Sequence, residues 1–244
     1  MSILSNVKKK IIVNAGHFLP TDKGFVCENC GFNNETLNEA ELTIKIRDEL
    51  LPMLKRNLFD VTSVPDDRNL RQSIDIANVA APTLNDGLCM DIHLNSNKNP
   101  DMRGVEMYSG TSPISAQISR VLSKNLAKIA QIPDRGYKPH TQAFVGSLGW
   151  IVQTNSWAVV AECAFLSNKD DRALLQRPDG PNLIAKGILY GILELYGMTP
   201  IEPESPKEEK EAELNRLQKT IDWIKGLLVA LTLKVNQKLG RGKF

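Results

Sequence analysis

Two kinds of hydrophobic pattern alternate along residues 1–198. Short apolar runs alternate with longer segments in which apolar residues recur every three or four positions. The runs predict strands at Lys10–Ala15, Leu58–Val64, Gly87–Leu94, Val105–Tyr108 and Trp157–Phe165. The longer segments predict helices at Thr36–Lys55, Leu70–Ala81, Ser115–Ile129 and Leu183–Tyr196. Because several runs are apolar on both faces, the pattern predicts an α/β fold with a mostly parallel central sheet and helices on both faces.

A different pattern begins at residue 199. Residues 199–211 hold three prolines and a cluster of charges, so this segment predicts a linker between domains. In residues 212–244 the apolar positions are separated alternately by three and four residues: Leu214, Leu217, Ile221, Ile224, Leu228, Leu231 and Val235. This spacing is typical of a coiled coil. We therefore expect a catalytic or binding domain over 1–198 and a C-terminal helix that assembles a homo-oligomer.

Two other interpretations of the C-terminal helix stay open. An amphipathic helix of this kind also folds back onto its own domain. The apolar face is wider than a two-stranded seam, and Lys and Arg residues crowd the end of the chain. That combination also occurs in helices that lie on membrane surfaces. We favour self-association over both.

Composition excludes several classes of protein. The 244 residues carry 30 Lys+Arg and 28 Asp+Glu, and 42% are hydrophobic, so the chain is not disordered. A formal charge of +2 and only 6% aromatic residues argue against a nucleic-acid partner. The apolar run near the N-terminus is too short for a signal peptide, and no run is long enough to span a membrane. We therefore expect a cytoplasmic protein when it is made.

Two of the three histidines lie at the ends of predicted strands. His17 closes the sequence NAGH after the first strand, and His93 lies in MDIHLN. In a parallel sheet the carboxyl ends of strands line the functional crevice, and Gly16 lets the backbone turn tightly there. Imidazole is the commonest protein ligand for zinc, so the pair predicts a metal site. Asn95, in the same motif as His93, is a candidate substrate-binding residue.

A catalytic zinc site commonly has three protein ligands, and two histidines with one carboxylate are an established set. Glu39 begins the helix that follows the first strand, which brings it near the same sheet edge as His17. Glu35 and Glu41 compete for this role, and an acidic residue in a first helical turn also stabilises a helix without any metal.

Glu162 is the candidate catalytic residue. It lies near the end of the apolar strand in VVAECAFLSN, where a carboxylate is costly to desolvate unless it has a partner or a task. Beside a metal-activated water, such a group accepts a proton during attack on a carbonyl and delivers it to the leaving amine.

Five segments together resemble a known family. They are IIVNAGH, NEAELTIKI, IDIANVA with DGLCMDIHLNS, RGVEMY and VVAECAFLSN, and in this order they span most of residues 9–198. The chain resembles the zinc-dependent N-acetylmuramoyl-L-alanine amidases of bacterial autolysins and phage endolysins. The resemblance implies a phosphorylase/hydrolase-like fold, Zn²⁺ held by His17, Glu39 and His93, and Glu162 as the catalytic residue. It also implies hydrolysis of the amide between N-acetylmuramic acid and L-alanine in bacterial peptidoglycan, with action on the cell wall after release.

The chain departs from the family pattern at two places. Many members have a glycine-rich stretch after the first histidine, where this chain has FLPTDKG followed by Cys27 and Cys30. The cysteine pair is open to interpretation as half of a second zinc site, a redox disulfide, a loop-stiffening contact or two inert thiols. Members also commonly carry an arginine where this chain has Val152.

Two rival functions remain at this point. One is a non-catalytic protein that binds or assembles on the cell wall and keeps the amidase fold. The other is a zinc peptidase that cuts within the stem peptide. The presence of all four candidate site residues favours the amidase over the first rival.

Overall fold

The computed structural model describes residues 2–31 and 35–202. A single folded unit spans Met1–Pro200. The predicted coiled-coil helix at 212–244, and the predicted linker at 199–211 beyond residue 202, lie outside the described residues. Both therefore stay predictions, as does the homo-oligomer that depends on the helix.

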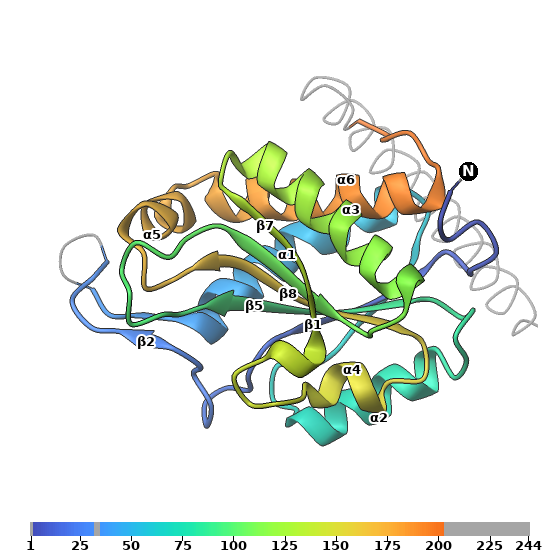
Figure 1. The fold of residues 1–244 in the computed structure, drawn as a ribbon, viewed down its shortest axis with the longest axis horizontal. Coiled ribbons are helices and arrows are strands. Elements are labelled where there is room, and N and C mark those ends of the chain that lie inside the picture. The colour runs from blue at the N-terminus through green and yellow to red at the C-terminus, as the bar shows by residue number, and fades with distance from the viewer. Residues whose placement is uncertain (1, 32–34, 203–244) are drawn as a thin grey trace, which may run out of the picture. The chain divides into compact units, whose positions relative to one another are not determined.

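The centre of the fold is a six-stranded sheet in the order β4-β1-β5-β8-β6-β7 (Figure 1). The parallel strands are β4 (Asp60–Ser63), β1 (Lys10–Ala15), β5 (Leu88–Asn95) and β8 (Trp157–Phe165). The remaining strands, β6 (Val105–Ser109) and β7 (Asp134–Pro139), are parallel to each other, and β6 is antiparallel to β8. The predicted mostly parallel sheet is confirmed, with one reversal of direction between β8 and β6.

Three long helices cover one face of the sheet. They are α1 (Glu39–Arg56), α3 (Pro113–Ala130) and α6 (Gly180–Tyr196) (Figure 1). Alternate strand residues such as Val13, Met90 and Ala161 point into the larger of two apolar cores, together with the inner faces of these helices. The alternation follows from the two-residue repeat of a strand, and it leaves the intervening residues for the opposite face.

The opposite face is covered by α2 (Leu70–Ala80) and the short helix α4 (Gly149–Gln153). The core there is smaller and includes Ile12, Cys89 and Val160 on the strands and Trp150 on α4. Further along β1, β5 and β8, the same face carries polar side chains: Asn14, Asp91, His93 and Glu162. A cleft lies over these strand ends.

The sequence pattern identified the main elements and missed several short ones. The strands at Lys10–Ala15 and Trp157–Phe165 begin and end where predicted, whereas the first long helix begins at Glu39 because the Asn38 side chain caps it. Three kinds of element were not predicted: the hairpin of β2 (Val26–Cys27) and β3 (Leu37–Asn38), strand β7, and the short helices η2 (His140–Gln142), α4 and α5 (Lys169–Gln176). Strand β7 has no hydrophobic alternation because it is a half-exposed edge strand with the sequence DRGYKP.

Cys27 and Cys30 form a disulfide at the start of the β2–β3 hairpin. The structure therefore supports the disulfide among the interpretations of this pair. In a disulfide neither sulfur is a free thiolate, so the pair does not form half of a second zinc site. The other two cysteines, Cys89 and Cys163, are buried in the two cores.

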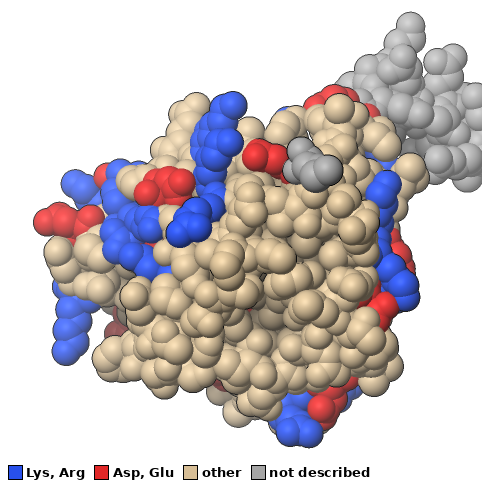
Figure 2. All heavy atoms as spheres, turned by 45° about the vertical axis from the view of Figure 1, so that its right-hand side comes forward, with Lys and Arg blue, Asp and Glu red and all other residues tan. Residues whose placement is uncertain are grey.

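The surface carries charges of both signs. Figure 2 shows one face on which uncharged residues occupy most of the centre, while Lys, Arg, Asp and Glu lie around the edge. No helix within the described part of the chain is long and apolar enough to cross a membrane.

Candidate metal and catalytic site

His17 follows β1 in a backbone conformation with φ 73°. The strand pairing continues through Gly16, whose N–H donates to the Ile92 carbonyl at 2.7 Å, and the chain then turns sharply. The turn directs the imidazole toward α1, where Nε2 lies 3.0 Å from Glu39 Oε2. The other ring nitrogen, Nδ1, lies 2.9 Å from Asp22 Oδ2, which fixes the orientation of the ring.

Glu39 is the first residue of α1, and its side chain is only 6% exposed. Its Oε1 accepts a hydrogen bond from the Leu94 N–H at 3.0 Å, and its Oε2 accepts one from the Phe25 N–H at 3.0 Å. Burial disfavours the charged carboxylate, but hydrogen bonds and charge interactions with His17 and His93 outweigh burial and hold the pKa of Glu39 well below its usual value. Glu39 is therefore a fixed anion.

His93 lies on β5 and contacts two carboxylates. Its Nδ1 is 3.0 Å from Glu39 Oε1, and its Nε2 is 3.2 Å from Asp91 Oδ2. The Asn14 amide donates to the other Asp91 oxygen at 2.7 Å. Burial alone would lower the pKa of His93, but Asp91 and Glu39 raise it well above its usual value. Both histidines thus have one ring nitrogen beside Glu39 and the other beside an aspartate.

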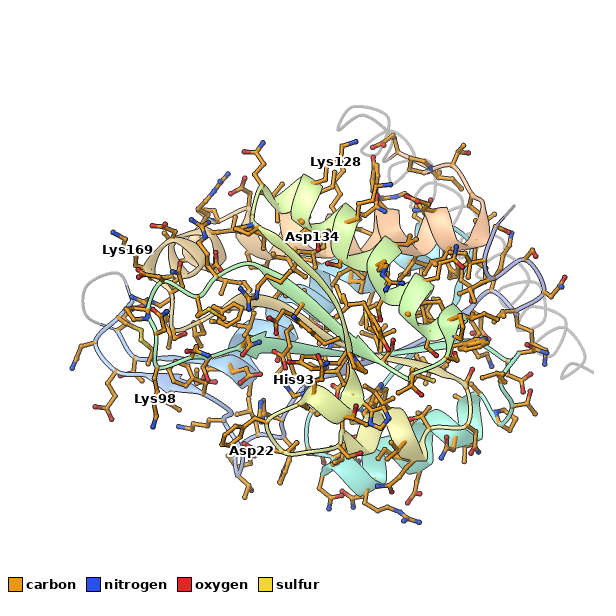
Figure 3. The ribbon with its side chains drawn as sticks, in the orientation of Figure 1. Asp22, His93, Lys98, Lys128, Asp134 and Lys169 are labelled. Atoms are coloured by element: carbon orange, nitrogen blue, oxygen red, sulfur yellow. A yellow bond between two sulfur atoms is a disulfide. The ribbon has the colours of Figure 1, made fainter. Side chains whose placement is uncertain are left out.

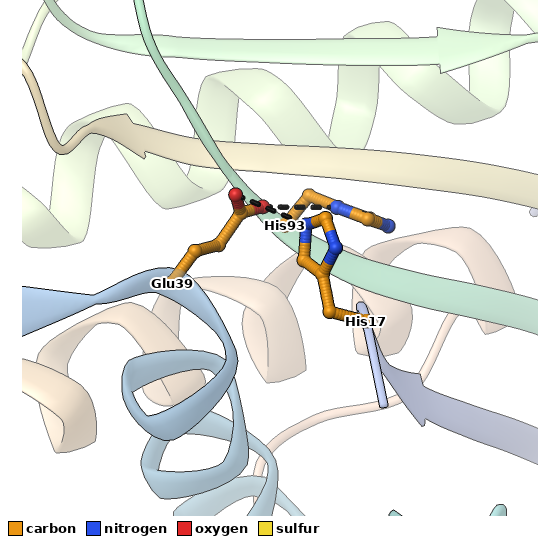
Figure 4. A group of neighbouring side chains, drawn as sticks. All are labelled: His17, Glu39 and His93. Carbon is orange, nitrogen blue, oxygen red and sulfur yellow. Dashed lines mark hydrogen bonds and ion pairs between the residues drawn. The ribbon is translucent and has the colours of Figure 1, made fainter. Parts of the chain in front are cut away.

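The three predicted ligand residues meet in space (Figure 4). One ligand atom from each of His17, Glu39 and His93 lies within 4.8 Å of the others. Around a tetrahedral zinc ion with bonds of about 2.0–2.1 Å, neighbouring ligand atoms are roughly 3.3 Å apart. The histidine-to-glutamate separations of 3.0 Å are close to that value, so the donor set and its spacing fit a zinc ion.

Two glycines make room for the imidazoles. A Cβ atom at Gly16 would lie 2.4 Å from the His93 ring. At Gly24, which has φ +63°, a Cβ atom would lie 2.4 Å from the His17 ring and 2.6 Å from the Glu39 carboxylate. Both contacts are shorter than real Cβ contacts, so the backbone packs directly against the three ligand residues.

Glu162 lies on β8 between two unlike neighbours. His93 is its register partner on β5, and Glu106 is its register partner on β6. Its Oε2 is buried and has no hydrogen-bond partner among the described residues. Burial, the main cause, raises the pKa of Glu162 to about 7; His93 opposes the shift, and Glu39 and Glu106 add to it.

Glu106, whose charge helps to raise the pKa of Glu162, is itself held by three side chains. Arg135 Nε on β7 lies 2.5 Å from Glu106 Oε1. The Asn95 amide and the Tyr108 hydroxyl donate to Glu106 Oε2 at 3.1 and 3.3 Å. Asn95 is thus bound to a neighbouring side chain and is not among the residues that line the cleft, so its role in substrate binding stays a prediction.

The cleft over the strand ends has a volume of about 250 Å³. His17, His93 and Glu162 line it on the sheet side, and Leu70 and Trp150 line it from the helices of the smaller core. Figure 3 shows Asp22 and His93 toward the lower centre of the view, with Lys98 and Lys169 at its left. Two of the three candidate ligand residues and Glu162 therefore face the same cleft.

Sequence reasoning missed the residues that orient the ligands. Asp22 lies in a loop with no regular pattern, and the loop fold alone brings it to His17. Asp91 carried a usable signal, because residues two apart on a strand share a face and Asp91 precedes His93 by two. The competing carboxylates Glu35 and Glu41 are exposed and do not belong to the cluster.

Comparison with known proteins identifies the family. Residues 11–194 match the family of N-acetylmuramoyl-L-alanine amidase. The chain belongs to this amidase family. The predicted peptidoglycan amidase activity, which cleaves the amide between N-acetylmuramic acid and L-alanine, is confirmed at the level of the family.

Individual relatives agree with this assignment. The amidase is 26% identical over 209 residues to the endolysin of Bacillus phage SPP1, covering 82% of this chain and 74% of the relative. The catalytic domain of CwlV, an N-acetylmuramoyl-L-alanine amidase from Bacillus (Paenibacillus) polymyxa var. colistinus, superposes with a TM-score of 0.65 and 25% identity, covering 78% of this chain and 98% of that domain. An N-acetylmuramoyl-L-alanine amidase from Clostridium difficile 630 has the same fold, with a TM-score of 0.65, 21% identity, and 78% and 96% of the two chains covered.

Proposed function

We propose that this amidase binds Zn²⁺ through His17, Glu39 and His93 and uses Glu162 to transfer the proton in amide hydrolysis. The observation that carries the proposal is the convergence of two imidazoles and one carboxylate, from three distant segments, to within 4.8 Å. Three ligands of this kind leave a fourth position open, as a catalytic zinc site requires.

The surrounding residues support this assignment. Asp22 and Asp91 each contact one histidine, as carboxylates commonly do around zinc-binding imidazoles. Glu39 is held by two backbone N–H groups, so its position does not depend on the metal. When bound, Zn²⁺ would supply Lewis acidity to the scissile carbonyl and to water.

Glu162 has the properties of a general base that becomes a general acid. Its Oε2 has no hydrogen-bond partner within the described residues, so it is available to a water or to the substrate. A pKa of about 7 lets the carboxylate accept a proton and release it again near neutral pH. We assign to it proton uptake from the attacking water and proton delivery to the nitrogen of the leaving L-alanine.

We further propose a site of action and a division of the chain. The phage endolysin among the relatives supports action on the bacterial cell wall. Residues 1–198 would form the catalytic domain, and residues 212–244 would join copies of the chain. A chain that ends after Pro206 should then be folded, active and monomeric in sedimentation, whereas an unchanged sedimentation profile would contradict the oligomeric role.

The test of the catalytic proposal is a wall digest by the full chain with its metal content measured. We expect about one zinc ion per chain, and we expect mass spectrometry to show free lactyl carboxyl groups on muramic acid together with new L-alanine amino termini. New termini elsewhere in the stem peptide would favour the zinc peptidase. Full activity in zinc-free protein would contradict the metal assignment.

A further inference from the structure

Arg68 is an arginine at the edge of the cleft that holds the candidate metal site. It lies in the loop between β4 and α2 and lines the same cleft as His17 and Glu162. The acidic residues along this lining are Asp22, Asp91 and Glu162, and Arg68 is the only lysine or arginine among the described lining residues. The position of this single guanidinium needs a reason.

The protein itself makes little use of the Arg68 side chain. Its Nε lies 3.3 Å from Asp67 Oδ1, and the two side chains are 40% and 66% exposed, so solvent weakens the pair. The two terminal nitrogens of Arg68 have no partner among the residues that the structure describes. Four N–H groups are therefore free to bind a planar anion such as a carboxylate, which matches a guanidinium in two parallel hydrogen bonds.

The backbone beneath Arg68 is firmly held. The buried Arg47 side chain pairs with Asp66, and the Asp66 carbonyl accepts a hydrogen bond from the Leu19 N–H at 3.1 Å. On the other side, Asn69 caps α2 through a capping box with Gln72. Arg68 thus precedes the positive end of a helix and is attached to a fixed loop, and both features favour an anion in this part of the cleft.

We propose that Arg68 binds the α-carboxylate of the stem-peptide residue that follows L-alanine. This inference rests on the proposed function, because it takes the scissile amide to lie at the metal site. Two extended residues span roughly 7 Å, so the residue after L-alanine stays close to the scissile amide. Arg68 lines the same cleft as His17 and Glu162, so a stem peptide whose first amide is at the metal site presents its next residue inside the cleft that Arg68 borders.

The proposal assigns a substrate preference. The residue after L-alanine in bacterial stem peptides is a γ-linked D-glutamyl unit, whose α-carboxyl group is free in some walls and amidated in others. A guanidinium pairs with the free carboxylate in a charge-assisted contact and gains far less from the neutral amide. Arg68 therefore selects walls with the free carboxylate.

The experiment compares two substrates that differ in this group alone: N-acetylmuramoyl-L-alanyl-D-glutamate and N-acetylmuramoyl-L-alanyl-D-isoglutamine, each with its γ-carboxyl group blocked as the methylamide. The wild-type full chain should prefer the carboxylate by about tenfold to a hundredfold in kcat/KM, mostly through KM. Arg68→Gln should abolish the preference while it retains kcat, and Arg68→Lys should keep part of it. Arg71→Gln is the matched control, because Arg71 is an exposed residue of α2 that pairs with Asp75 and does not line the cleft.

A binding measurement separates this proposal from the catalytic one. Titration calorimetry of both compounds with the Glu162→Gln chain, with and without Arg68→Gln, reports the carboxylate preference without turnover. A preference that depends on Arg68 supports the proposal even if the wild type hydrolyses neither compound, a result that would count against the proposed function alone. Equal binding of the two compounds, or an equal loss of both on Arg68→Gln, would overturn the role of Arg68.

Discussion

The two faces of the sheet divide stability and chemistry between them. On the face under α1, α3 and α6, strand residues stay apolar along the strands and pack into one large core. On the face under α2 and α4, the same strands begin apolar and become polar from Asn14, Asp91 and Glu162 onward. A strand can carry both functions because successive side chains point to opposite faces. The large core stabilises the strands from which the ligand residues project. The opposite face can therefore carry buried polar and charged side chains that would destabilise an apolar core.

The largest expected effect on activity comes from removing a proposed zinc ligand on the polar face of the sheet. Glu39→Ala should reduce bound zinc to near zero and abolish hydrolysis, because it removes the carboxylate that contacts both histidines. Zinc content by mass spectrometry and wall digestion measure this. Glu41→Ala is the control: it also removes an acid from the first turn of α1, but it is exposed and should keep zinc and activity. Equal zinc loss in both variants would show an effect on the helix rather than on ligation.

The next effect concerns proton transfer. Glu162→Gln keeps the shape of the side chain but cannot accept a proton, so activity should fall by about 10²–10⁴ while zinc stays bound. Kinetics with metal analysis on the same sample provide the measurement. Loss of zinc from this variant would mean that Glu162 is a metal ligand and that its catalytic role is wrongly assigned.

A smaller effect should follow from changing the residues that orient the ligands. Asp91→Asn keeps the size of the side chain but weakens its contact with His93, so zinc affinity should fall by about tenfold to a hundredfold. Competition with a chelator of known affinity gives the value. An unchanged zinc affinity would show that the contact between Asp91 and His93 does not contribute to metal binding.

The pH profile should show an acidic limb. Because the general base must be ionised, kcat/KM should rise as pH increases through the pKa of Glu162, which is about 7 in the metal-free protein. A bound cation favours the charged carboxylate, so the limb of the zinc enzyme should lie at or below pH 7. A limb centred above pH 8 would contradict this assignment.

The smallest effect on activity is expected in the large core. Ile188→Ala in α6 removes a fully buried side chain and should cost about 2–5 kcal/mol of unfolding free energy. The melting temperature should fall accordingly, while kcat/KM of the folded enzyme at low temperature stays within about twofold of wild type. A large loss of kcat/KM without a loss of stability would show that the two faces are not separate.

The fold was predictable from the sequence where a buried face makes apolar residues repeat at a regular spacing. Strands β1 and β8 and helices α2, α3 and α6 follow the hydrophobic pattern, because each packs a regular face into a core. The reversal of direction between β8 and β6 was not predictable, since parallel and antiparallel neighbours require the same buried residues. The β2–β3 hairpin was missed because strands of two residues have no period.

The candidate site was predictable only in part. His17, Glu39, His93 and Glu162 lie at or near the ends of elements that the pattern identifies, which puts them at one sheet edge. The pattern left Glu35 and Glu41 as rivals to Glu39, and the resemblance to the amidase family favoured Glu39. Asp22, which orients His17, comes from a loop, and Arg135, which pairs with Glu106, comes from an edge strand. Only the folded chain brings these two residues near the site. Arg68 is a similar case, because nothing in its local sequence indicates a cleft.

The reversal of strand direction at β8 limits how this chemistry could be moved to another protein. It gives Glu162 an imidazole on one side and, on the other, the Glu106 carboxylate, which pairs with Arg135 from the outermost strand and still helps to raise the pKa of Glu162. A designer who grafted only His17, Glu39, His93 and Glu162 onto a wholly parallel sheet would lose Glu106 and its pair with Arg135. The transferable unit is the four central strands with their edge strand, rather than four side chains.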